Sequence, residues 1–402
     1  MDLTAAARKL QSLRSSMTGH TDRSEERRIL ELFSGATAAE LNYLLLNVDL
    51  DALFGDVDDR VVGPDNLTTL LELLCVKRAH ELGLPVRAAL IAALQKGDTH
   101  GLAERMVRAL FLGLRGRELS EFKNLLDGRG NSHDLQQLLF HDVDDARIRQ
   151  DILAHIDKEA AAAPSGENKV LSDIDDTFLA NWKDERYPSK TVYPGVLQFY
   201  RELDRGPGVI PGREGDVTFI SARPQDPLGL IEDRTLATLR GHGVSSAVML
   251  SGAFTHLLGN SRIAEMKFEN FSRYIQLYPE YGFVFTGDSG QGDVAFGEQM
   301  LMAHPEEVRA VFIHDVVDTP EPVRMTWRGK RIFFFDTYIG AAVEAYEVGV
   351  IARDGVARVA RAAQEDLARV PFASEAQRQA RLAELERDLR RAEAITGTTR
   401  AG

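Results

Sequence analysis

The feature that most constrains the fold is an apolar strand that ends in acidic residues near the middle of the chain. The predicted strand begins at Val170, and Asp173-Ile174-Asp175-Asp176 follows it. Carboxylates packed this tightly repel one another and raise each other's pKa values unless a cation holds them. An acidic turn that caps a helix would also account for the run, so its interpretation depends on later parts of the chain.

Further polar residues follow in an ordered series. Ser221 ends one predicted strand and Asp288 ends another, with Asp293 in the Gly-rich loop after it. Lys267 lies between these strands in a segment with helical apolar spacing. Alone, Ser221 would be a turn residue and Lys267 a surface charge. Together they fit the carboxyl ends of parallel strands, where open α/β sheets bind ligands.

The series Asp173, Ser221, Lys267 and Asp288 resembles the four motifs of the haloacid-dehalogenase-like phosphatases. The segments SDIDDT, PGV, GDSGQGD and FFDTYIGAAVEAY narrow the resemblance to the actin-patch type of phosphatidate phosphatase, a relative of the lipins. It extends over residues 169–351. We therefore predict an α/β fold, a doubly wound parallel sheet. The gaps between the motifs are too short for a large cap.

The resemblance implies a catalytic role for four residues. Asp173 would be the nucleophile that forms an aspartyl phosphate, and Asp175 would protonate the leaving group and later activate water. Ser221 would hydrogen-bond the phosphoryl group, and Lys267 would neutralise nucleophile and phosphate. A phosphatidate-binding module without turnover is an alternative, but the presence of both Asp173 and Asp175 favours catalysis.

The resemblance also implies a Mg²⁺ site built from oxygen ligands. Its predicted ligands are Asp173, the carbonyl of Asp175, and Asp288, with Asp293 as a further ligand or as an orienting residue. Mg²⁺ suits an oxygen-only set of this kind, because it keeps several waters and bridges to phosphate.

Phosphatidate or a related phospholipid is the substrate that the resemblance implies, with Thr177 and Arg223 as predicted substrate-binding residues. Thr177 could instead orient the loop, and Arg223 could form a surface ion pair. In the family, Asn, Ser, Pro and an aromatic residue follow the serine of the second motif, whereas Ala222-Arg223-Pro224-Gln225 stands here. A soluble phosphomonoester or a phosphoprotein is therefore the alternative substrate.

Composition changes along the chain predict its domain organisation. The predicted parts are a flexible tail over residues 1–24, a helical domain over 25–157, a linker over 158–168, the phosphatase domain over 169–351 and a charged helical tail over 352–402. Within the helical domain, the acidic segment at 56–59 recurs at 142–145 with similar flanking residues. This echo predicts an internal duplication.

The second copy in the helical domain also weakly resembles an annexin repeat. The segment ALQKGDTHGLAERMV looks like a calcium loop between two helices, although it lacks one glycine, and Asp142 falls near the distal acidic ligand. Acidic residues before a helix are more often N-caps. A helical packing or recruiting module is therefore the favoured interpretation.

Net charge and cysteine content limit the partners and the compartment. A net charge of −13 argues against nucleic acid as a partner. It also means that an anionic membrane must be met through a local patch or a bridging cation. The single cysteine, Cys75, rules out an internal disulfide framework. With no signal-peptide pattern at the N-terminus, we expect a cytoplasmic protein with peripheral membrane contact as a possibility.

Overall fold

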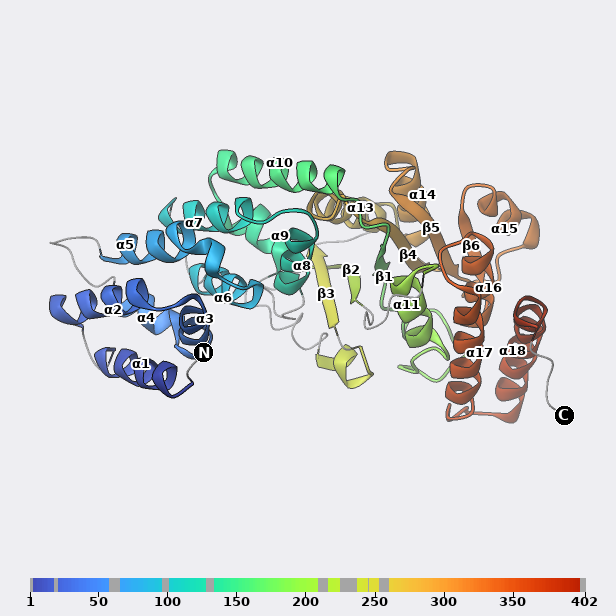
Figure 1. Ribbon diagram of the computed structural model, residues 1–402. Helices are drawn as coiled ribbons and strands as arrows, with labels where there is room; N and C mark the ends of the chain where they lie inside the picture. The colour runs from blue at the N-terminus through green and yellow to red at the C-terminus, as the bar shows by residue number, and fades with distance from the viewer. Residues whose placement is uncertain are drawn as a thin grey trace. The chain divides into compact units, whose positions relative to one another are not determined.

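The computed structural model describes residues 3–17, 21–57, 66–95, 101–127, 134–208, 216–224, 237–244, 246–252 and 260–397. The chain divides into two compact units. The first consists mainly of helices α1 to α10, and the second mainly of the strands and the helices from α11 onward (Figure 1).

The first unit is helical throughout its described residues. Its α-helices are α1 (Leu3–Ser16), α2 (Arg23–Gly35), α3 (Ala38–Asn47), α4 (Leu50–Val57), α5 (Asn66–Glu72), α6 (Leu84–Leu94), α7 (Gly101–Leu112), α8 (Gly116–Asp127), α9 (Leu135–Gln137) and α10 (Ala146–Ala162). The π-helices η1 (Leu73–Lys77) and η3 (Leu138–Asp142) and the 3₁₀-helix η2 (Ala79–Glu81) complete it.

The predicted flexible tail is wrong for residues 3–16, which form α1. Ala6, Leu10 and Leu13 recur at spacings of four and three residues and are buried. This apolar stripe packs α1 against α2 and α3.

Two buried glutamates occupy corresponding places in the first unit. Glu26 near the start of α2 accepts a hydrogen bond from Asn66 at the start of α5. Glu104 near the start of α7 accepts from the backbone N–H groups of Asp144 (2.6 Å) and Asp145 (3.2 Å), just before α10. Each glutamate thus binds the beginning of another helix. This parallel is in keeping with the duplication, which stays a prediction.

The acidic segment that suggested a calcium site is bound by protein groups. The two carboxylate oxygens of Asp142 accept hydrogen bonds from the amides of Gln95 (2.7 Å) and Gln137 (2.9 Å). Asp145 is the N-cap of α10, as the alternative interpretation predicted. Residues 96–100, which include the predicted calcium loop, lie outside the described residues, so calcium binding stays a prediction.

The second unit is built on a parallel sheet in the order β3-β2-β1-β4-β5-β6. The strands are β1 (Asn168–Ser172), β2 (Asp216–Pro224), β3 (Ser246–Gly252), β4 (Gly282–Asp288), β5 (Val308–His314) and β6 (Ile332–Phe335). The strand order reverses its direction between β1 and β4, which makes this pair the topological switch point of a doubly wound fold. The predicted fold class is therefore confirmed.

Alternating apolar residues bury both faces of this sheet. On one face, Phe312 of β5 packs edge-on against Phe199 of α11 (Val196–Arg205), with ring centroids 5.5 Å apart. On the other, Phe285 of β4 meets Phe296 of α14 (Asp293–Ala303) at 4.8 Å, and α13 (Asn260–Leu277) joins α14 there through Phe271. Residues 225–236 and 253–259 lie outside the described residues, so the absence of a large cap stays a prediction.

The C-terminal helices, which were predicted as a charged helical tail, pack onto this core. The helices α16 (Tyr338–Glu347), α17 (Arg353–Leu367) and α18 (Glu375–Thr396) lie against one another (Figure 1). Leu385 and Leu389 of α18 are buried in the same hydrophobic cluster as residues of β1, β4 and β5. A narrow leucine stripe is enough to pack this charged helix against the domain, because only one face of α18 contacts it.

One glycine of the PGV segment lets α11 approach α17 closely. Gly195 has φ = 85°, and a Cβ atom there would lie 2.8 Å from the Cβ of Ala363. Its backbone N–H donates to the carboxylate of Asp366 at 3.0 Å. Any other residue would be strained and would push the two helices apart.

Within the described residues, no helix is both long and apolar enough to cross a membrane.

Candidate active site

The acidic residues predicted from the sequence converge at the switch point between β1 and β4. Asp173 follows β1 directly, and its backbone N–H donates to the carbonyl of Thr286 in β4 at 2.9 Å. Asp288 is the last residue of β4, and Asp293 is the first residue of α14. All three side chains are buried.

Lys267 joins two of these carboxylates. It lies on α13, and its Nζ donates to Oδ1 of Asp173 at 2.6 Å and to Oδ1 of Asp293 at 2.5 Å. Its side chain is only 2% exposed. Burial disfavours its charge, but the carboxylates of Asp173 and Asp293 outweigh burial and raise the pKa of Lys267 above its ordinary value.

The three carboxylates form a compact buried cluster. Each of Asp173, Asp288 and Asp293 offers an oxygen, and these oxygens all lie within 4.8 Å of one another. Oδ2 of Asp293 also accepts the backbone N–H of Asp288 at 3.1 Å. Gly287 makes this approach possible, because a Cβ atom there would lie 2.6 Å from the side chain of Asp293.

The electrostatics of the cluster call for a further cation. Burial raises the pKa of Asp173 to about 7, with Lys267 opposing and Asp293 adding to the shift. Burial and the charge of Asp293 likewise raise the pKa of Asp288 well above its usual range. Lys267 is a single positive charge among three carboxylates, so a divalent cation would complete the neutralisation. The oxygen-only ligand set fits Mg²⁺.

Asp176 organises the loop that follows Asp173. Its backbone is in the left-handed region (φ = 58°), which Asp tolerates better than most residues. Its buried carboxylate accepts backbone N–H groups from Asn181 (2.9 Å), Trp182 (3.1 Å) and Lys183 (2.6 Å). Asn181 in turn donates from its side chain to Oδ1 of Asp175 at 2.8 Å. The loop thereby orients Asp175 beside Asp173.

Three further predicted site residues are Thr177, Ser221 and Arg223, and the structure describes the side chain of Thr177 alone. Thr177 is fully buried, and its carbonyl accepts from the hydroxyl of Tyr338 at 2.6 Å. Its side chain is as buried as that of Asp288, and its role stays a prediction. Ser221 and Arg223 lie in β2, at the same edge of the sheet, but their side chains fall outside the described residues.

The sequence analysis did not identify three further residues that contact the loop after Asp173, namely Asp184, Arg186 and His314. Arg186 forms two hydrogen bonds to the carboxylate of Asp184, at 2.8 and 3.0 Å. His314, at the end of β5, hydrogen-bonds the carbonyl of Asp176 through Nδ1 at 2.8 Å, and Arg186 lies 3.4 Å from its Nε2. His314 therefore donates from Nδ1 and stays neutral, with its pKa lowered by burial and by Arg186. The one sequence feature that could have identified His314 is its position at the end of a predicted buried strand.

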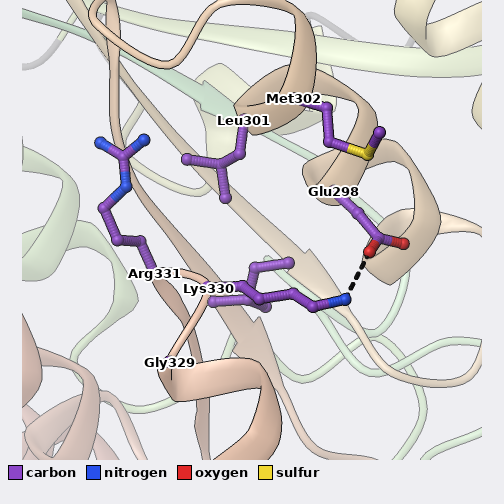
Figure 2. A pocket seen from close by; sticks show the side chains of 7 residues that line it. Glu298, Leu301, Met302, Gly329, Lys330 and Arg331 are labelled. Atoms are coloured by element: carbon purple, nitrogen blue, oxygen red, sulfur yellow. Dashed lines mark hydrogen bonds and ion pairs between the residues drawn. The ribbon is translucent and has the colours of Figure 1, made fainter.

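A cavity of about 350 Å³ lies elsewhere in the second unit. Figure 2 shows its lining, with Met302 and Leu301 of α14 near the turn before β6 and the ion pair of Lys330 with Glu298 (2.7 Å) at one side. None of its lining residues belongs to the acidic cluster.

Fold and site together define the class of this unit. Buried aspartates and a lysine at the switch point of a doubly wound parallel sheet are the arrangement of an α/β phosphatase domain. Residues 168–315 match the family model described as phosphatidate phosphatase APP1, catalytic domain. The match starts at the first residue of β1 and includes every predicted site residue. It confirms the resemblance over this segment and indicates a phosphoric monoester hydrolase.

The family match leaves the helical first unit and the segment from residue 316 onward uncovered. Searches of curated proteins and of solved structures found no match to this chain.

Proposed function

We propose that the second unit hydrolyses phosphatidate or a related phospholipid with the help of Mg²⁺ and through an aspartyl phosphate on Asp173. The observation that carries this proposal is the buried contact of Lys267 with Asp173 and Asp293 at the switch point. The family match over residues 168–315 supports the substrate class.

In the proposed reaction, an oxygen of Asp173 attacks phosphorus while the bond from phosphorus to the alcohol oxygen breaks. Asp175 donates a proton to the leaving alcohol, so that diacylglycerol leaves when phosphatidate is the substrate. Asp175 then takes a proton from water, whose oxygen attacks phosphorus and releases Asp173 and inorganic phosphate. The hydrogen bond from Asn181 supports this role, because it holds Asp175 in place through both steps.

Asp173, Asp288 and Asp293 would hold the Mg²⁺, together with the carbonyl of Asp175 that the resemblance implies. Bound there, the cation supplies positive charge against which the carboxylates and the phosphate oxygens are neutralised. Lys267 opposes the rise in the pKa of Asp173 and so favours the ionised form of that carboxylate. For the whole protein we propose a cytoplasmic location with peripheral contact to membranes.

Phosphate release from a panel of substrates tests the proposal. The panel contains phosphatidate, lysophosphatidate, sugar phosphates and phosphopeptides, each with Mg²⁺ and with a chelator. We expect release from phosphatidate that stops on chelation. Preference for a soluble substrate would favour the alternative assignment, and binding of phosphatidate without release would indicate a non-catalytic module.

Two variants separate the chemical steps. Asp173→Asn should lower turnover by at least about a thousandfold, because the nucleophile is lost while the shape is kept. Asp175→Asn should slow hydrolysis of the intermediate, so that a hydroxylamine-labile phosphoprotein accumulates from labelled substrate. Asp354→Asn is the matched control, since Asp354 is exposed on α17. Wild-type turnover in Asp173→Asn would overturn the mechanism.

A further inference from the structure

An exposed tryptophan stands on the loop that orients the active site. Trp182 is 69% exposed, although tryptophan is usually largely buried. The loop that carries it is held in place, because the backbone N–H of Trp182 donates to Oδ1 of Asp176 at 3.1 Å. A large apolar ring is thus exposed to solvent on a loop that the buried carboxylate of Asp176 holds in place, at a cost in hydration free energy that the fold itself does not require.

A second loop meets this one at the site. A Cβ atom on Gly290 would lie 3.1 Å from Cγ of Lys183 and 3.2 Å from Cγ2 of Val316, so both loops border this glycine. The backbone N–H of Gly290 donates to Oδ1 of Asp288 at 2.7 Å. Val317, the next residue on the second loop, is 51% exposed. The rim of the site therefore carries an exposed apolar side chain on each of two loops.

Lys183 adds a positive charge to this rim. Its side chain is exposed, and in the described part of the chain it forms no ion pair. The chain as a whole carries a net charge of −13 and would be repelled by an anionic surface. Lys183 is thus a positive charge beside Gly290, whose backbone N–H binds Asp288.

We propose that Trp182, Val317 and Lys183 form a lip that contacts the surface of a bilayer containing anionic phospholipid. This inference rests on the proposed hydrolysis of a phospholipid. Trp182 and Val317 enter the boundary between headgroups and acyl chains, where tryptophan is preferred. Lys183 binds lipid phosphate at the headgroup level. A phosphatidate molecule then reaches Asp173 without leaving the bilayer entirely, because its phosphate already lies at the depth of the lip.

Exposed acidic residues near the lip limit how strongly it binds an anionic bilayer. Glu185 and Asp318 are both exposed within two positions of lip residues, and they oppose anionic lipid. Two apolar side chains and one lysine against two acids give weak, reversible contact. Such contact allows the enzyme to leave the surface after turnover.

Another exposed apolar residue supplies a matched control. Met302 is 76% exposed and lines the cavity of Figure 2. It lies nine residues after Asp293 on α14 (302 − 293), which is about 14 Å along the helix axis at 1.5 Å per residue. If exposed apolar surface alone drove membrane binding, Met302 would matter as much as Trp182.

Fluorescence tests the lip directly, because the chain has two tryptophans, Trp182 and Trp327. In an Asp173→Asn background, which leaves the lipid intact, Trp327→Phe isolates the emission of Trp182 and Trp182→Phe isolates that of Trp327. With vesicles of phosphatidate in phosphatidylcholine, we expect a blue shift and quenching by brominated lipid for Trp182 only. Unchanged emission of Trp182 would overturn the proposal, whatever the activity.

Activity provides the second measurement. Hydrolysis of phosphatidate in vesicles is divided by hydrolysis of water-soluble short-chain phosphatidate. In the variant that combines Trp182→Ser with Val317→Ser, this ratio should fall by at least about tenfold at limiting lipid. Lys183→Gln should lower it less, and Met302→Ser should leave it unchanged. An unchanged ratio in the double variant would overturn the proposal.

The two measurements distinguish failure of the lip from failure of the proposed function. If the wild type hydrolyses neither form of phosphatidate, the proposed function is wrong, and the emission of Trp182 still decides whether the lip binds lipid. If the wild type hydrolyses phosphatidate and the emission of Trp182 does not change, the function stands and the lip is wrong.

Discussion

The ammonium group of Lys267 lies 2.6 Å from Oδ1 of Asp173, and both side chains are buried. The lysine reaches this position from α13, while the aspartate follows β1, so the contact forms only when the sheet and its covering helix are assembled. Folding and the arrangement of the reactive carboxylate are thereby coupled.

Replacing this lysine should cost both activity and stability. Lys267→Met leaves buried carboxylates without their cation, and breaking a buried pair costs about 3–5 kcal/mol. The loss should be largest above pH 7, where Asp173 would be ionised, and smaller at pH 5. Urea unfolding of the metal-free protein at both pH values measures it. Equal losses at the two pH values would contradict the electrostatic explanation.

Mg²⁺ should stabilise the protein increasingly as pH rises. Burial raises the pKa of Asp173 to about 7 from a usual value of 3.8. A raised carboxyl pKa contributes stability below 3.8 that is lost as pH rises through about 7. The metal needs the ionised carboxylates, so its stabilisation grows over that interval. Melting temperatures with Mg²⁺ and with a chelator from pH 5.5 to 8.5 test this. In Asp173→Asn the pH dependence should be reduced.

Gly287→Ala should damage the site although it neither removes nor adds a charged group. Its new Cβ would lie 2.6 Å from the side chain of Asp293, and displacement of that carboxylate should lower turnover by about a hundredfold. Overpacking should also cost about 1–3 kcal/mol of stability. Gly35→Ala is the control, because no atom lies within 4 Å of a Cβ there. Kinetics at saturating Mg²⁺ and thermal unfolding of both variants provide the comparison.

His314 should make the protein less stable in acid. Burial and Arg186 lower its pKa from 6.5, so the unfolded chain binds this proton more readily than the folded one. The stability contribution is complete above pH 6.5 and is lost as pH falls through the lowered value. His314→Gln removes the titrating group while keeping a donor for the carbonyl of Asp176. Unfolding of both proteins at pH 7.5 and 5.5 should show the smaller decrease in the variant.

The strands and the buried acidic cluster could be predicted because their signals are local. An apolar run that stops at a polar residue marks a buried strand and its functional end, which located Asp173 and Asp288 and their order along the chain. Helical spacing placed Lys267 on a helix, and the order of the motifs indicated that it would meet Asp173.

The contacts within the loop after Asp173 have a different physical origin. Nothing in the spacing of Asp176 shows that its carboxylate accepts the backbone N–H groups of residues 181–183. The sequence predicted a charged helix over α18 but not the surface that it covers, because a charged helix shows its single buried face only when the surface opposite is known.

The burial of Asp388 on the C-terminal helix α18 implies that truncated variants of this protein should lose function. Asp388 of α18 is 1% exposed and accepts a hydrogen bond from Thr337, the N-cap of α16. A premature stop codon before α18 would leave every predicted site residue encoded and yet uncover the surfaces of α16 and α17 that α18 packs against. Loss of phosphatase function by truncation should therefore arise well downstream of residue 315, where the family match ends.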